Sequence, residues 1–244
     1  MSRRNRRPAS LAPSDAYAAS RPLFIEHRDE DKYRYTKVGS AVLIRYRGHY
    51  YAVAARHSLY AGPYGVEQIR IPARNGPAKH ATFVGFDDCW IAAGEEDAHD
   101  FLLLRLTTRD GFPPWRADCA SLTQRTTDLA QKHFTQHSSF AVSGYPNHGT
   151  NLIDYEANAI WHQRCIVACE YDRPTDPWIH SLNMLHEGAL TDYRGLSGGL
   201  VMARTTDGLA LAGMVITGSP ESKIVRFIDI RAIVAGIRDF EKQL

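Results

Sequence analysis

A serine flanked by glycines is the first place in this sequence where residue types and spacing suggest chemistry. The segment Asp192 to Leu200 reads Asp-Tyr-Arg-Gly-Leu-Ser-Gly-Gly-Leu. Glycine adopts backbone angles that other residues avoid, so the N–H groups of Gly195 and Ser197 could converge on an oxyanion beside the Ser197 hydroxyl. The same composition is also typical of an ordinary turn. A catalytic interpretation therefore requires a base elsewhere in the chain.

His57 is the candidate for that base, because a serine hydroxyl becomes nucleophilic when a base accepts its proton. It follows the run Tyr-Tyr-Ala-Val-Ala-Ala-Arg at 50–56, so the end of a strand would hold its imidazole. Asp100 stands directly before a Phe-Leu-Leu-Leu run and could fix the tautomer of that imidazole. The alternative interpretations are a structural histidine and a turn aspartate, and His99 and Asp97 are neighbouring candidates.

The order of these residues along the chain separates the hydrolase architectures. Gly195 to Gly199 also fits the G-x-S-x-G motif of α/β-hydrolases, but in that fold the histidine follows the serine. No histidine follows His186. The subtilisin order would need an early aspartate and parallel strands with crossover helices, which the pattern lacks. The order that remains is His57, Asp100, Ser197.

With these residues identified, the sequence resembles the trypsin- and chymotrypsin-like serine proteases over about residues 20 to 235. Val53 to His57 is similar to the histidine motif of that family. Asp100 to Leu104 is similar to its aspartate strand, and Gly195 to Gly199 to its serine loop. The resemblance implies a serine endopeptidase that needs no cofactor and acts on a protein or peptide substrate. Whether a regulatory protein partner also binds stays open.

The resemblance also implies a role for each site residue. Ser197 would attack the peptide carbonyl, His57 would carry the proton, and Asp100 would orient the imidazole. The amides of Gly195 and Ser197 would bind the oxyanion. Catalysis would then depend on a Ser-His-Asp triad and a backbone oxyanion hole.

Substrate-binding residues follow from the same resemblance. The strand after the serine pairs with substrate backbone in that family, which implies that Ile216, Thr217 and Gly218 line the specificity groove. The loop position implies Thr191 at the floor of the pocket and Asp192 beside it. No carboxylate clearly stands where a basic substrate side chain would bind, so we expect a small or medium apolar residue before the cleaved bond.

Four residues depart from the family pattern. Ala54 and Arg56 differ within the histidine motif, and Leu196 and Leu200 flank the serine where aspartate and proline are usual. None of these changes removes a catalytic group. They leave open the alternative that the chain is a catalytically inactive relative of these proteases and acts as a peptide- or protein-binding module. In secreted members of the family, the aspartate at the position of Leu196 pairs with the N-terminal ammonium that is freed when a propeptide is cleaved. Leu196 cannot form this ion pair, so we expect no such activation step.

Short apolar or alternating runs separated by glycine, proline, asparagine and aspartate dominate the chain and predict strands. Arg47-Gly48-His49 predicts a tight hairpin, and only residues 231–244 carry a helical apolar period. The predicted strands are 41–46, 50–54, 68–72, 81–87, 101–106, 140–145, 151–161, 165–171, 180–185, 199–203, 209–217 and 224–230.

The strand pattern and the resemblance together predict an all-β fold of two antiparallel six-stranded β-barrels with a C-terminal α-helix. We expect a disordered tail at residues 1–20, because its Arg, Ser, Ala and Pro residues show no period. The first barrel, with His57 and Asp100, would occupy residues 21–125. The second barrel, with Ser197 and the helix, would occupy residues 126–244.

Composition and charge exclude other classes. The 244 residues carry 29 basic against 27 acidic side chains, a net charge of +2, so bulk charge does not predict a nucleic-acid partner. No apolar run is long enough to span a membrane, so no membrane partner is expected. The four cysteines are too few and too irregular for a disulfide framework, which predicts a reducing, cytoplasmic environment.

One set of potential zinc ligands comprises His162, Cys165, Cys169 and His180. Their spacing is not that of a zinc finger. Alternation along the predicted strand places both cysteines on one face, which favours buried structural thiols. We therefore expect no metal.

Overall fold

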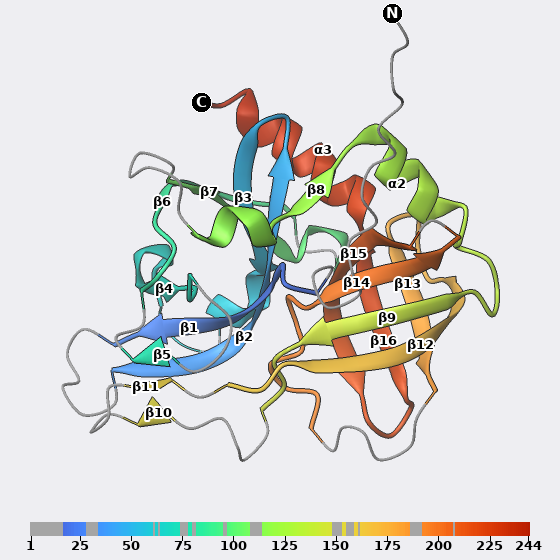
Figure 1. Cartoon of the computed structure of the whole chain (residues 1–244), viewed down its shortest axis with the longest axis horizontal. Helices are drawn as coiled ribbons and strands as arrows, with labels where there is room; N and C mark the ends of the chain where they lie inside the picture. Colours follow the sequence, from blue (N-terminus) through green and yellow to red (C-terminus); the bar gives the residue numbers. More distant parts are fainter. Residues whose placement is uncertain are drawn as a thin grey trace, which may run out of the picture.

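Two β-sheets lie side by side, and a helix at the end of the chain packs against both (Figure 1). The computed structural model describes residues 17–27, 34–60, 62, 64–73, 78–79, 82–94, 97–107, 114–147, 153–154, 159–160, 162–185, 192–206 and 208–244. A third, small sheet joins β5 (Ala78–Lys79), β10 (Ile153–Asp154) and β11 (Ala159–Ile160).

The first sheet contains seven strands in the order β4-β1-β2-β3-β7-β6, with β8 parallel to β2. Its centre is fully buried, since the Leu-rich strand β7 and the Ala- and Val-rich strand β3 pair there. The strands are β1 (Ser20–Glu26), β2 (Tyr35–Tyr46), β3 (His49–Ala55), β4 (Ile69–Arg70), β6 (Phe86–Ile91), β7 (Phe101–Leu106) and β8 (Ala120–Leu122).

The predicted tight hairpin is confirmed between β2 and β3. Tyr46 pairs with His49, so Arg47 and Gly48 form a two-residue turn. Both have positive φ, at 50° and 90°, which is the conformation that such turns require. The strand expected at 81–87 instead begins at Phe86, where pairing with Leu106 of β7 starts.

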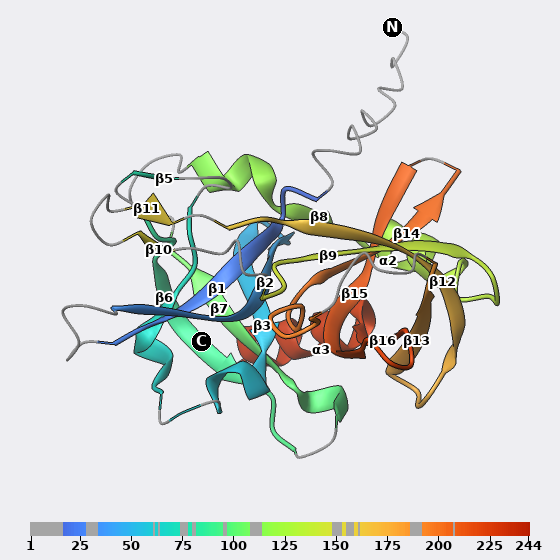
Figure 2. The same cartoon turned by 90° about the horizontal axis from the view of Figure 1, so that it is seen from below.

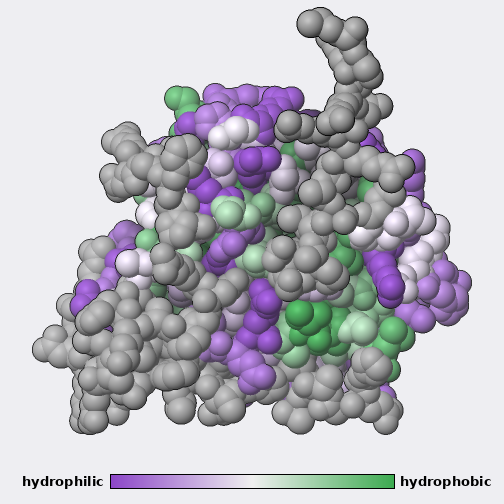
Figure 3. Space-filling view, in the orientation of Figure 1, coloured by the Kyte–Doolittle hydropathy of each residue, from purple (hydrophilic) through white to green (hydrophobic). Residues whose placement is uncertain are grey.

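The second sheet is a closed barrel in the order β12-β13-β16-β15-β14-β9. Its strands are β9 (Ser139–Gly144), β12 (Cys165–Pro174), β13 (Ile179–Met184), β14 (Leu200–Thr205), β15 (Gly208–Ser219) and β16 (Ile224–Asp229). Alternation along β12 buries Val167, Cys169 and Tyr171 in the barrel. The other face points outward, and Figure 3 shows an apolar area over β9 and β12, where Ile166 is exposed.

The predicted all-β class is confirmed, together with its two β units and the C-terminal helix. The two units differ from one another: the second is a closed six-stranded barrel, whereas the path of the first stays open among the described residues. The first unit is therefore a curled seven-stranded sheet rather than a six-stranded barrel. Its β2–β8 pair is also parallel, because the chain returns to β2 after η4 (Pro114–Asp118).

Helix α3 (Ile230–Glu241) is the predicted C-terminal helix, and its buried stripe contains Ile233, Val234, Ile237 and Phe240. Figure 2 shows it between the first sheet and the barrel. Gly236 lies against Phe101 of β7 and Trp90 of β6. One hydrophobic cluster therefore joins both sheets through this helix.

Helix α2 (Gln124–Gln131) is not among the elements that the sequence predicts. Its start is defined by Thr123, whose hydroxyl accepts the N–H of Thr126. The weak apolar stripe buries only Thr127 and Ala130, which explains why the sequence pattern misses it. The remaining 3₁₀ turns are η1 (Arg56–Leu59), η2 (Val66–Gln68) and η3 (Asp97–His99).

The described structure begins earlier than the boundary expected after residue 20. Tyr17 and Ala19 are buried, and β1 starts at Ser20. Leu43 donates its N–H to the carbonyl of Ala19, 2.8 Å away. Arg21 is fully buried and pairs with Asp118 at 2.6 Å. Residues 17–20 therefore form part of the packed chain, and residues 1–16 lie outside the described residues.

Candidate active site

His57 and Asp100 meet where β3 and β7 pair. Ala55, the last residue of β3, lies opposite Phe101, so the residues just outside this pair are neighbours. The Asp100 Oδ1 atom accepts the backbone N–H of His57 at 2.9 Å, and Oδ2 contacts the imidazole Nδ1. The Asp100 carbonyl also accepts the N–H of Arg56 at 3.2 Å. The carboxylate thus fixes both the backbone and the ring of the histidine.

This contact decides which nitrogen of His57 is free. Because Nδ1 faces a carboxylate, it carries the proton, and Nε2 is left as an acceptor. The His57 side chain is 47% exposed and that of Asp100 is 17% exposed, so the ring stays accessible while the carboxylate is mostly covered. Neither Asp97 nor His99 forms a hydrogen bond with His57 among the described residues.

Two peptide N–H groups are free in the segment Arg194 to Gly199, which we call the serine loop. In this described segment the N–H groups of Leu196, Gly198 and Gly199 donate to carbonyls of Tyr193, Val215 and Leu196 at 2.8–2.9 Å. The N–H groups of Gly195 and Ser197 donate to no carbonyl or side chain that the structure describes. These are the two amides that the sequence predicts for the oxyanion hole.

The direction of these two amides is fixed by carbonyls on the same peptide units. The Arg194 carbonyl, joined to the Gly195 nitrogen, accepts the N–H of Asn147 at 2.6 Å. The Leu196 carbonyl, joined to the Ser197 nitrogen, accepts the N–H of Gly199 at 2.8 Å. Because a peptide unit is planar and trans, each held carbonyl turns its N–H to the opposite side.

Two glycines are required for this loop shape. Gly195 and Gly198 have φ angles of +85° and +82°, in the left-handed region. A Cβ on Gly198 would lie 1.8 Å from the carbonyl oxygen of Ser40, and one on Gly195 would lie 2.7 Å from that of Tyr145. Both positions therefore exclude any side chain.

Ser40 of β2 joins the first sheet to the serine loop. It is fully buried, and its hydroxyl donates to the Gly195 carbonyl at 2.7 Å and accepts the N–H of Tyr145 at 2.9 Å. Its own N–H donates to the Ser197 carbonyl at 2.8 Å. Ser40 is not among the site residues that the sequence predicts, since no motif links it to a loop 155 residues away.

The Ser197 hydroxyl does not bond to the histidine. Ser197 Oγ donates to the Ile216 carbonyl at 2.9 Å, and the structure gives no hydrogen bond between Ser197 and His57, both of which it describes. Proton transfer to His57 Nε2 would require rotation of the Ser197 side chain. Catalytic hydrogen bonds are often loose in structures without substrate and tighten when it binds.

The residues predicted to bind substrate backbone, Ile216, Thr217 and Gly218, lie near the end of β15. The register against β16 shifts between Val215 and Thr217, so Ile216 is a bulge residue and its carbonyl faces Ser197. From Ile216 onward β15 pairs only with β16 among the described strands, which leaves its other edge unpaired at Thr217 and Gly218. An extended peptide could add to that edge.

The predicted pocket residues have different outcomes. Thr191 lies outside the described residues. Asp192 forms an ion pair with Arg194, whose Nε and Nη2 atoms lie 3.0 and 2.7 Å from Oδ2. The Asp192 carboxylate thus already has a cationic partner from its own loop.

Leu196 packs in the interior of the barrel. It is 1% exposed and belongs to the cluster that contains Val142, Val201 and Val215. An ammonium group beside it would be buried without a partner, which is unfavourable by several kcal/mol. The position is consistent with a loop that is ordered without a cleaved N-terminus.

Two members of the cysteine and histidine set considered for zinc, His180 and Cys169, have other surroundings. His180 bonds to the Tyr171 hydroxyl at 2.8 Å and lies 3.4 Å from Asp229. Burial raises the pKa of the Cys169 thiol to about 12. Within the described ranges, no group of three His, Cys, Asp or Glu side chains could hold a metal ion.

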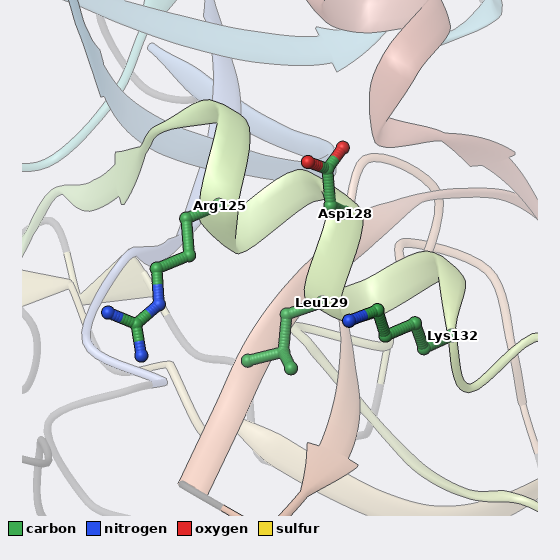
Figure 4. Close-up of a pocket in the computed structure, with 4 residues that line it drawn as sticks. All are labelled: Arg125, Asp128, Leu129 and Lys132. Atoms are coloured by element: carbon green, nitrogen blue, oxygen red, sulfur yellow. The ribbon is translucent and has the colours of Figure 1, made fainter.

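A surface hollow on α2 offers no alternative active site. Figure 4 shows its four lining side chains, which come from α2 and the residue directly after it and do not converge: Arg125, Asp128, Leu129 and Lys132. It holds no pair of nucleophile and base. Of the helices that the structure describes, none is long and apolar enough to cross a membrane.

A scan of the sequence against models of protein families finds no match, and neither does a search of curated proteins. The assignment of function therefore depends on the geometry of His57, Asp100 and the serine loop.

Proposed function

We propose that this chain is a serine endopeptidase related to the trypsin- and chymotrypsin-like proteases. Ser197 is the nucleophile, His57 the general base and acid, and Asp100 the group that orients the imidazole. The amides of Gly195 and Ser197 form the oxyanion hole. The substrate is a protein or peptide, and no cofactor takes part.

The observation that carries the proposal is the pair of free amides in the serine loop. Gly195 is buried and Ser197 is half-buried, and buried peptide N–H groups are normally paired. Two unpaired N–H groups are therefore unusual here, all the more because Asn147 and Gly199 hold the carbonyls of the same peptide units in place. The two contacts between Asp100 and His57 also support the proposal, since they leave the Nε2 atom of His57 free to accept a proton.

The reaction proceeds in two halves. The Ser197 hydroxyl rotates away from Ile216, gives its proton to His57 Nε2 and attacks the peptide carbonyl, whose oxygen becomes negative between the amides of Gly195 and Ser197. The imidazolium returns the proton to the leaving amine as the C–N bond breaks. Water then hydrolyses the acyl-enzyme by the same proton route, and Ser197 is regenerated.

Substrate binding follows from the open edge of β15. A peptide paired with Thr217 and Gly218 would present its carbonyl to Ser197. Because Asp192 is paired with Arg194, the carboxylate is not set up to receive a basic side chain. A small or medium apolar residue before the cleaved bond is the expected preference.

One observation favours a second candidate, a peptide-binding module that does not cut. The Ser197 hydroxyl bonds to the Ile216 carbonyl instead of His57. If that arrangement persisted with a peptide bound, the β15 edge would still hold the peptide while the hydroxyl stayed unactivated.

A fluorophosphonate probe separates the two candidates, because it labels only an activated serine. We expect the wild-type protein to be labelled at Ser197, with labelling absent in Ser197→Ala and in His57→Ala. Peptide libraries incubated with wild type and Ser197→Ala then identify the cleaved bonds. A protein that binds library peptides but is neither labelled nor active would be the non-cutting module.

A further inference from the structure

Lys37 reaches from the first sheet to the segment that follows β9. This half-buried residue lies on β2, and its Nζ donates to the carbonyls of Tyr145 and Pro146 at 2.9 and 2.7 Å. One ammonium therefore holds two successive carbonyls of the barrel from the other sheet.

The held segment touches the oxyanion hole directly. Asn147, the next residue, donates its N–H to the Arg194 carbonyl at 2.6 Å, and this contact directs the N–H of Gly195. The carbonyl oxygen of Tyr145 lies so close to Gly195 that a Cβ there would be 2.7 Å away. A shift of the Tyr145 to Asn147 segment would therefore turn the Gly195 amide.

We propose that Lys37 is a positioning residue for the oxyanion hole and that the loss of its charge at alkaline pH loosens the hold on Gly195. This inference rests on the proposed function, since an oxyanion hole matters only to a hydrolase. Among the described residues, Lys37 forms no hydrogen bond with Ser197 or with the predicted substrate strand, so it would act through Asn147 and the Arg194 carbonyl.

The surroundings of Lys37 bring its pKa closer to neutrality than that of an exposed lysine. Burial lowers the pKa of Lys37 to about 8, and the nearby Asp192 opposes this shift. Burial also lowers the pKa of His162, which faces Lys37, to about 4, so that histidine is neutral at pH 7. The Tyr145 phenol has a pKa raised to about 12 by burial and is neutral as well. On β1, the residue paired with Lys37 is the apolar Phe24.

Loss of charge weakens both hydrogen bonds from Nζ. Charge-assisted hydrogen bonds are roughly twice as strong as neutral ones. Above about pH 8 the neutral amine of Lys37 would hold the Tyr145 and Pro146 carbonyls less firmly. Turnover is expected to fall through that range.

Stability changes in the opposite direction. The pKa of Lys37 is lower in the folded chain, about 8, than its ordinary value of 10.5, so between these values the unfolded chain binds more protons. The contribution of Lys37 to the free energy of unfolding therefore rises with pH across this window. A fall in turnover above pH 8 is thus distinguishable from unfolding caused by Lys37.

The first experiment measures kcat and KM between pH 6 and 10 with one library-selected peptide. In wild type we expect kcat to fall above about pH 8. In Lys37→Met we expect kcat at pH 7 to drop roughly tenfold to a hundredfold, with a smaller change in KM and no further alkaline fall. In Lys37→Arg, which stays charged, we expect the alkaline fall to disappear or move upward.

The matched control is Lys132→Met, which removes an exposed lysine side chain directly after α2, and it should retain the wild-type pH profile. A second readout, the NMR shift of the Gly195 amide, does not depend on catalysis. We expect this shift to titrate with a midpoint near pH 8 in wild type and not in Lys37→Met.

Each outcome tests one statement. A Lys37→Met variant with the wild-type kcat and the same alkaline fall would overturn the positioning role. A Gly195 amide shift that changes neither with pH nor on substitution of Lys37 would overturn it as well. A wild type that is never labelled by fluorophosphonate, with a Gly195 shift that still follows Lys37, would refute the proposed function while keeping the structural link.

Discussion

The His57–Asp100 pair and the serine loop are built in different ways. His57 and Asp100 sit at the ends of two paired strands, β3 and β7, and the pairing of Ala55 with Phe101 brings them together. The serine loop belongs to the barrel, yet Ser40 of the first sheet holds the carbonyls of Gly195 and Ser197.

This difference shows which part of the site depends on the contact between the sheets. The histidine and aspartate are positioned within a single sheet by a local strand register. The amides of the serine loop take their direction partly from another sheet, so they respond to changes far away in the sequence. Substitutions can test the two regions separately.

The largest effect is expected from the reacting groups themselves. Ser197→Ala and His57→Ala should each lower kcat by roughly a millionfold, because the hydroxyl and its base act as one unit. The double variant should be little worse than either single one. Steady-state kinetics on purified variants checks this, and losses that add up would contradict a shared proton route.

Asp100→Asn tests the first region alone. The amide would favour the wrong imidazole tautomer while leaving the fold intact, so kcat should fall roughly 10⁴-fold. The measurement is kcat with the same peptide, together with a thermal unfolding curve. Full activity in this variant would instead indicate Asp97 as the partner of His57.

Ser40→Ala tests the second region. Loss of the hydroxyl leaves the Gly195 carbonyl and the Tyr145 N–H without this partner, which should lower the free energy of unfolding by about 1–3 kcal/mol. We expect kcat to fall about tenfold to a hundredfold, because Gly195 loses the hydrogen bond on its carbonyl and the adjacent Tyr145 segment loses the hydrogen bond on its N–H, so both hold the serine loop less firmly.

Ser143→Ala is the matched control for Ser40→Ala. Ser143 lies in β9, is equally buried, and its hydroxyl has no hydrogen-bond partner among the described residues. Its removal should leave kcat unchanged and leave stability unchanged or slightly higher. Urea unfolding and kinetics on both variants check the contrast, and equal losses in the two would mean that Ser40 has no special link to the loop.

The smallest effect is expected from trimming the N-terminus. Because Leu196 offers no partner to a new ammonium, removal of residues 1–16 should leave kcat within about twofold of the intact chain. Trimming through Ser20 should instead destabilise the protein, since it removes the buried Tyr17 and Ala19. The measurements are the turnover of one peptide and the thermal unfolding of the intact chain and of the two trimmed chains. Mass spectrometry verifies the termini of each. An intact chain that is silent until trimmed would contradict the role given to Leu196.

Elements whose signals are local could be predicted from the sequence. The alternating runs of β12 and β15, the two-residue turn at Arg47-Gly48 and the apolar stripe of α3 are all set by neighbours within a few residues. The glycines at 195 and 198 also reveal a loop with left-handed angles. The residue types and chain order of His57, Asp100 and Ser197 were sufficient to select the candidate site.

The contacts that hold the serine loop could not be predicted from the sequence. Ser40, Lys37 and Asn147 carry no motif, and their roles arise because separate segments place backbone carbonyls within 3 Å of them. The direction of the Ser197 hydroxyl toward Ile216 likewise depends on a bulge in β15, which sequence alternation does not indicate. Local periodicity predicts which residues form a strand, but contacts between distant segments depend on how the sheets pack, and that is a property of the whole chain.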